Sequence, residues 1–185
     1  ITGFNILRLR NILGRKTGHE SKVYPSFEEK RFNIPKNEVK PMKQNHDVLE
    51  GKDKKEFLKG AEIAYETILT AFANSEVKKL KDLLTPTMNS NFSDAIEARN
   101  SEKIKSEFTF IGMKESSVEK YEKVNDVLFA TVRFVAEVIS VKKDKNDKII
   151  EGNPDKIKFV TDIWKFTKNI KKNSPNWYLS EIISQ

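Results

Sequence analysis

The chain contains no cysteine among its 185 residues. Disulfide bonds, thiolate metal sites and a cysteine nucleophile are therefore excluded outright. Histidine is scarce as well: His19 and His46 are the two histidines, and both stand in a polar, proline-containing stretch. A histidine-based acid–base pair or zinc site is hard to assemble from them. We therefore expect no catalytic residue, no metal and no cofactor.

Acidic residues are outnumbered, and the net charge is +7. Of the 34 basic residues 28 are Lys, a bias typical of an AT-rich genome, so the charge does not indicate a nucleic-acid partner. Residues 1–56 carry 13 Lys and Arg against 8 Asp and Glu, whereas residues 57–185 carry 21 against 19. The basic excess thus belongs to the first part of the chain, where an acidic partner is expected.

A long hydrophobic run is also missing. Residues 1–13 are mostly apolar and Arg15 and Lys16 follow, but the run is shorter than the roughly 20 residues that cross a bilayer. Because the chain begins with Ile and not Met, we interpret residues 1–16 as the end of a hydrophobic membrane-anchor helix with a basic flank, cut from a longer protein. The alternative is an amphipathic helix that packs on the domain or on a partner.

Residues 17–52 contain Pro25, Pro35 and Pro41 among scattered polar residues and have no sustained period. This composition predicts a flexible tether. A domain is then expected over residues 53–185.

The run from Phe57 to Phe72 has apolar residues at steps of three and four, which predicts an amphipathic helix. Asp53 and Glu56 are spaced as a variant of the capping box at its start. Ser75 is expected to cap a second, short helix. Thr85 and Pro86 have the residue types of the cap and first position of a third.

Several positions in order resemble one known family. They are Phe57, Gly60, Ala61, Tyr65, Ile68, Leu80, Leu83, Phe92, Ile96 and Arg99, followed by Val132-Arg133-Phe134, Glu151-Gly152, Asp162, Trp164, Phe166 and Pro175-Asn176-Trp177. Together they resemble the Tim-forty-four-like domain, found in a peripheral subunit of the mitochondrial inner-membrane protein translocase and in bacterial relatives. The stretch Arg8–Arg15 is similar to the segment that follows the single span of bacterial members. The resemblance covers about residues 53–185.

Strands are expected after the helices. Phe108–Met113, Ile157–Thr167 and Trp177–Ile183 read as strands, and Val127–Val141 has an apolar even face from Leu128 to Val138. Residues 144–147 read as a turn. Helices followed by an antiparallel sheet predict an α+β fold. The resemblance implies the cone shared with nuclear transport factor two, with helices packed in a curved sheet and an apolar pocket.

Two sets of site residues follow. The predicted pocket lining is aromatic and aliphatic: Tyr65, Ile68, Phe129, Phe134, Trp164 and Phe166. Each of them also fits simple core packing. The predicted lipid-binding surface combines lysines with apolar side chains: Lys52, Lys54, Lys55, Phe57, Leu58 and Lys59. That combination suits an anionic membrane, and the resemblance supports it because the mitochondrial relative is associated with cardiolipin-rich membrane.

Three charged residues stand inside predicted strands: Arg133, Glu137 and Asp162. There are two interpretations: the three residues form a catalytic cluster, or they form structural ion pairs or face the solvent. Ion pairs are favoured because they are the commoner cause and no histidine is near.

The resulting hypothesis is a non-enzymatic adaptor or scaffold at the bacterial inner membrane, linked to protein translocation or assembly. It would bind anionic lipid and a protein partner, with a single-span anchor and the domain facing the cytoplasm. A homo-oligomer stays open. The alternatives are a small-molecule-binding or enzymatic cone, and a ribosome-associated protein.

Overall fold

The computed structural model of the chain describes residues 48–172 and 174–183. The predicted anchor segment 1–16 and the predicted tether as far as residue 47 lie outside the described residues. Within the described part, no helix is both long and apolar enough to cross a membrane.

Three helices come first among the described residues, and they follow the predicted periodicity. Helix α2 spans Gly51–Ala73, α3 spans Val77–Lys81 and α4 spans Pro86–Ser101. The apolar stripe of α2 is buried, and Tyr65 and Ile68 are each 0% exposed, so both lie in the core, the alternative that the sequence left open for them. Helix α4 begins as predicted, since the Thr85 hydroxyl accepts the Met88 N–H at 3.4 Å and Pro86 follows it.

The predicted starts of the other two helices are wrong. The N-cap of α2 is Glu50, which makes no side-chain cap hydrogen bond, and Asp53 lies inside the first turn. An acidic side chain there still interacts favourably with the positive end of the helix dipole. Glu76, not Ser75, is the N-cap of α3. Ser75 has a φ of 59° and uses its hydroxyl to accept a hydrogen bond from Arg99 at 2.9 Å.

Five strands follow and form one antiparallel sheet, which confirms the α+β fold class. Their bounds are β1 Lys105–Val124, β2 Val127–Lys143, β3 Ile149–Gly152, β4 Lys158–Asn169 and β5 Tyr178–Ile183. The order is β1-β2-β4-β5, and β3 pairs with the C-terminal end of β2. The even residues of β2 from Leu128 to Val138 are all buried, as their alternation predicts.

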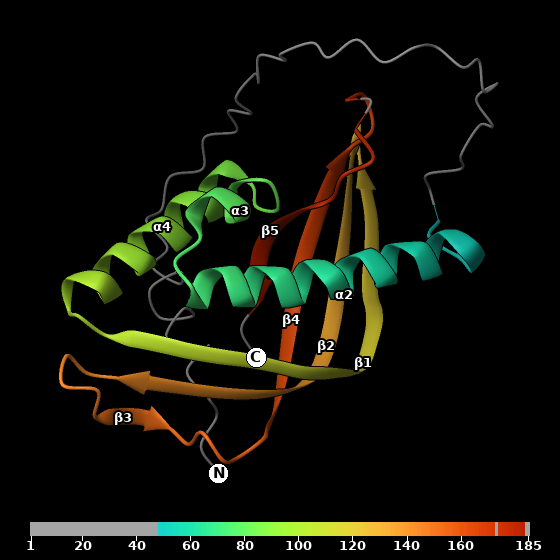
Figure 1. The fold of residues 1–185 in the computed structure, drawn as a ribbon. Helices are drawn as coiled ribbons and strands as arrows, with labels where there is room; N and C mark the ends of the chain where they lie inside the picture. Colours follow the sequence, from blue (N-terminus) through green and yellow to red (C-terminus); the bar gives the residue numbers. More distant parts are fainter. Residues whose placement is uncertain (1–47, 173, 184–185) are drawn as a thin grey trace, which may run out of the picture.

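The sheet is strongly curved, and α2 lies across its hollow (Figure 1). Three register shifts in β1, each an irregularity of the bulge type, account for much of the bending, because an extra residue turns the strand. Tyr65 stacks in this hollow against Phe134 and Trp164, with ring centroids 4.6 Å apart in both pairs. The sheet therefore wraps the helix, and this contact is the centre of the core.

The outer edge of β5 is covered by the linker between α3 and α4. The Thr85 N–H donates to the Leu179 carbonyl at 3.0 Å, and the Leu179 N–H donates to the Leu83 carbonyl at 2.9 Å. These bonds bring the end of the helical segment against the last strand. They also place Leu83 beside the segment that precedes β5.

Candidate functional site

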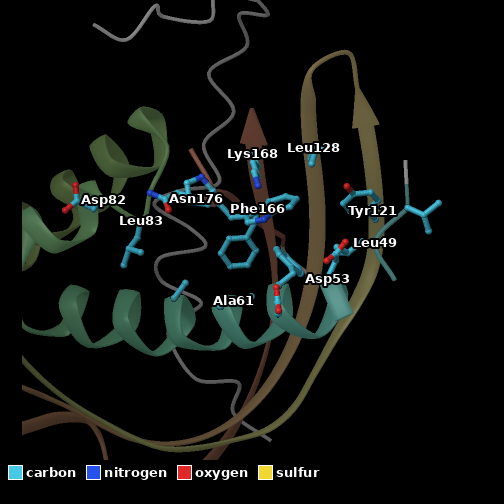
Figure 2. Close-up of a pocket in the computed structure, with 17 residues that line it drawn as sticks. Leu49, Asp53, Ala61, Asp82, Leu83, Tyr121, Leu128, Phe166, Lys168 and Asn176 are labelled. Carbon is cyan, nitrogen blue, oxygen red and sulfur yellow. The ribbon is translucent and has the colours of Figure 1, made fainter. Parts of the chain in front are cut away.

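A groove of about 530 Å³ opens beside the first half of α2. Its walls come from distant parts of the sequence: α2 and the two residues Val48 and Leu49 before it, the turn after α3, the ends of β1, β2 and β4, and the segment before β5. Figure 2 shows Leu83 on one side and Leu49 and Tyr121 on the other, with Phe166 between them. The topology alone brings these residues together.

Aromatic rings form the floor of the groove. Phe57 contacts Trp177 with ring centroids 4.7 Å apart, and it meets Phe166 edge-on at 6.2 Å. Ala61, Ala64 and Gly60 of α2 also line the space, and their small side chains leave it open. A largely apolar floor of this kind suits an aliphatic or aromatic group of a ligand.

Polar groups stand at the rim. Three of them are carboxylates, from Asp53, Glu56 and Asp82, and Lys168 and Asn176 are the others. The Glu56 carboxylate also pairs with Lys52 at 3.5 Å on the solvent side of α2. The rim is thus more acidic than basic, and it favours a ligand that carries positive charge near its apolar part.

The predicted pocket residues mostly lie elsewhere. Phe166 is the one of the six that lines this groove. Tyr65, Ile68, Phe134 and Trp164 are buried in the core, because α2 fills the hollow of the sheet where a pocket was expected. Phe129 lies on the outer face of the sheet, with the Lys165 ammonium 5.0 Å from its ring.

The predicted lipid-binding residues divide into three groups by exposure. Lys52, Lys55 and Lys59 are exposed on α2. Phe57, in contrast, is 8% exposed and belongs to the core, so its side chain is not part of an exposed surface. Leu58 and Lys54 are half-buried. The lysines are therefore the accessible part of this predicted surface.

The three charged strand residues do not converge on one cluster. Arg133 pairs with Glu115 at 3.1 Å and Glu137 pairs with Lys114 at 2.9 Å, as the favoured reading predicts. Asp162 faces α2 instead and accepts the Tyr65 hydroxyl at 2.6 Å. Burial first, and then the charge and hydrogen bond of Asp162, raise the pKa of Tyr65 far above its ordinary value.

No group of three His, Cys, Asp or Glu side chains in the described residues is placed to hold a metal ion. The groove residues that sequence reasoning missed include Leu49, Asp82, Tyr121, Lys168, Pro175 and Asn176. The Pro175-Asn176-Trp177 string was a usable signal, since it is one of the positions that carry the family resemblance.

Comparison with known proteins identifies a family. The model of the Tim44-like domain family matches residues 41–184. The intermembrane space region of the chloroplast protein ARC6 aligns at 12% identity with a TM-score of 0.47, over 69% of this chain and 97% of that one. A periplasmic fragment of TraM aligns at 13% identity with a TM-score of 0.45, over 73% and 98%. None of the curated proteins compared with the chain matches it.

The family match includes every helix and strand described above and well over half of the chain. It begins ten residues before α2 starts at Gly51. The chain belongs to the Tim44-like domain family.

Proposed function

We propose that the protein is a membrane-associated adaptor and not an enzyme. Its domain would hold a segment of a partner protein in the groove and bind anionic lipid through the lysines at the start of α2. The observation that carries the proposal is the groove, which combines an aromatic floor with an acidic rim.

The partner segment is expected to be apolar on one side and basic at its flanks. Its apolar side chain would contact Trp177, which is already packed on the buried Phe57 ring and loses little freedom on binding. Its basic groups would face Asp53 and Asp82 at the rim. Charge on the rim chiefly sets the choice of partner and the rate of association.

Filling the groove with a large side chain tests the binding of a partner segment. A Cβ added at Gly60 meets no atom within 4 Å, so Gly60→Trp places a large ring in the groove without disturbing the backbone. Ile63→Trp adds the same ring to α2 at a position that is 59% exposed and outside the groove. Anisotropy of a labelled amphipathic basic peptide should report binding to the wild type and to Ile63→Trp, and loss of binding to Gly60→Trp. Equal binding by both variants, or equal binding of an acidic peptide, contradicts the proposal.

The lipid part rests on Lys52, Lys54, Lys55 and Lys59. Each cation near an anionic surface contributes about 1 kcal/mol, and exposed charges are screened within about 8 Å at physiological ionic strength. Binding of the full chain to cardiolipin vesicles should therefore weaken with salt, and Lys54→Glu/Lys55→Glu should weaken it further. Both proteins share residues 1–47, so their difference isolates α2. Equal binding to neutral vesicles would contradict an electrostatic contribution of these lysines.

A further inference from the structure

Exposed apolar side chains gather at one end of the sheet. Within the described residues nine large hydrophobic side chains are exposed, and four of them fall between residues 149 and 159. They are Ile149, Ile150, Ile157 and Phe159, with exposed fractions of 42%, 51%, 48% and 67%. Scattered apolar residues need no explanation, but a concentration of this kind marks an interaction surface.

Lysines alternate with these apolar residues. Lys145, Lys148 and Lys156 are exposed, and none of the three forms an ion pair with another described residue. Two of the acidic side chains nearby are engaged: Asp147 pairs with Lys105 at 2.6 Å, and Glu151 pairs with Lys142 at 3.1 Å. Asp155 is exposed and forms no ion pair with another described residue. Asp144 accepts the backbone N–H groups of Asn146 and Lys148.

We call residues 143–159 the β3 tip. It carries five lysines against four acidic residues, and Lys142, directly before it, is held by Glu151. Lys143 is held by Glu107, and Asp147 by Lys105. The exposed lysines without an ion pair to a described residue, Lys145, Lys148 and Lys156, outnumber Asp155, so the exposed charge of the tip is positive. Figure 1 shows β3 at the end of the sheet far from the first turn of α2. The tip is therefore a separate surface from the α2 lysines and the groove.

The composition identifies the kind of partner. Protein–protein interfaces are depleted in lysine relative to the rest of the surface. A surface that mixes lysine with exposed isoleucine and phenylalanine instead suits the headgroup region of an anionic bilayer, where the apolar groups are buried and the ammonium groups stay near phosphate.

We propose that the β3 tip is a membrane-contact surface for anionic lipid. Ile149, Ile150, Ile157 and Phe159 enter the headgroup region, and Lys145, Lys148 and Lys156 contact the lipid phosphates. This surface has the exposed apolar residues that the α2 surface lacks, because Phe57 is buried there. Its action does not depend on the α2 lysines.

A fluorophore attached at the tip tests the proposal locally. The chain has no cysteine, so Ile150→Cys gives a single attachment point for a polarity-sensitive dye in the full chain. Glu97→Cys, at an exposed position of α4, is the matched control. With vesicles of phosphatidylcholine and cardiolipin, the emission of the tip dye should shift to the blue and gain intensity, while the α4 dye stays unchanged. An unchanged tip dye on vesicles that carry the bound protein overturns the proposal and leaves a protein partner as the reading of this surface.

Charge reversal supplies the second measurement. Lys145→Glu/Lys148→Glu should lower the vesicle partition coefficient reported by the tip dye at least about tenfold. Lys78→Glu/Lys81→Glu reverses the same number of exposed lysines on α3 and should change the partition coefficient little. Circular dichroism first verifies that each variant is folded. Equal losses in the two double variants overturn the proposal.

The α2 variant separates this surface from the one in the proposed function. A tip signal that persists in Lys54→Glu/Lys55→Glu supports two independent contacts. If Lys54→Glu/Lys55→Glu abolishes the tip signal as completely as Lys145→Glu/Lys148→Glu does, the tip does not bind lipid independently of the α2 lysines. The tip dye could fail to respond to cardiolipin while binding through Lys54 and Lys55 stays sensitive to salt. That result would reject lipid contact by the tip and retain the proposed function.

Discussion

Tyr65 shows how single residues fix the position of α2 on the sheet. Ser116, Phe134 and Asp162 lie side by side on β1, β2 and β4. The Tyr65 hydroxyl donates to Asp162 at one end of this row, and the Ser116 hydroxyl donates to Glu62 at the other. Phe134 lies between them under the Tyr65 ring. One polar contact on each side of an aromatic contact therefore sets where the helix crosses the strands.

The first prediction compares two isoleucines of α2. Ile68 is 0% exposed and Ile63 is 59% exposed. Ile68→Ala should lower the free energy of unfolding by about 2–5 kcal/mol, because it removes buried methylene groups and leaves a cavity. Ile63→Ala should change it by less than about 0.5 kcal/mol. Urea denaturation of both variants measures the difference, and similar losses would contradict the predicted placement of α2.

The second prediction concerns the pH dependence of Tyr65. Its pKa in the folded protein is raised above the ordinary value of 10.0, so the phenol keeps its proton after the unfolded chain has lost it. The stabilisation is therefore fully present below pH 10 and declines above it, by at most about 1.4 kcal/mol per pH unit. Tyr65→Phe should be less stable by about 1–3 kcal/mol at pH 8. Its deficit relative to the wild type should narrow by pH 11, and a constant deficit in urea titrations would contradict the assignment.

At the scale of elements, strong periodicity predicted structure well and irregular backbone did not. The even face of β2 alternates without a break, so its bounds of Val127–Lys143 were nearly predicted. Strand β1 was expected to end at Met113 but continues to Val124. Its later half is largely polar and its three register shifts interrupt the alternation. Strand β3 was missed because four residues are too few to show a period.

The third prediction concerns the glycine that ends β3. Gly152 has a φ of 88°, and a Cβ at this position would clash with the backbone carbonyl oxygen of Ser140. Gly152→Ala should therefore cost at least about 2 kcal/mol of stability and release β3 from β2. A Cβ added at Gly112 would meet no atom within 4 Å, so Gly112→Ala is the control. Hydrogen exchange of the β3 amides should accelerate in the first variant alone, and equal exchange in both would refute the explanation.

At the scale of the molecule, the α+β class and the burial of α2 followed from the order of periodic segments. The groove did not follow, because Leu49, Leu83, Tyr121 and Trp177 are distant in sequence and belong to no shared pattern. Their proximity depends on the curvature of the sheet and on the bonds that join Leu83 and Thr85 to Leu179. Sequence periodicity identifies which side chains are buried, whereas a surface groove depends on how whole elements meet.

The fourth prediction concerns membrane orientation. Arg8, Arg10, Arg15 and Lys16 follow the apolar start of the sequence, and short basic flanks are retained on the cytoplasmic side. The domain should therefore face the cytoplasm. A fluorescent protein that folds only in the cytoplasm, fused after Gln185 of the full-length protein, should fluoresce. An active fusion to a periplasmic phosphatase would reverse the orientation and remove the basis of the adaptor model.

The bonds between Leu179 and the linker after α3 have a consequence for the order of synthesis. The helices are made first, but the Leu83 carbonyl and the Thr85 N–H find their partners only when Leu179 has been added. Trp177, which covers Phe57, arrives at almost the same moment. A nascent chain therefore leaves α3 and the aromatic floor unfinished until Trp177 and Leu179 have been added, and during that interval it presents apolar surface to chaperones.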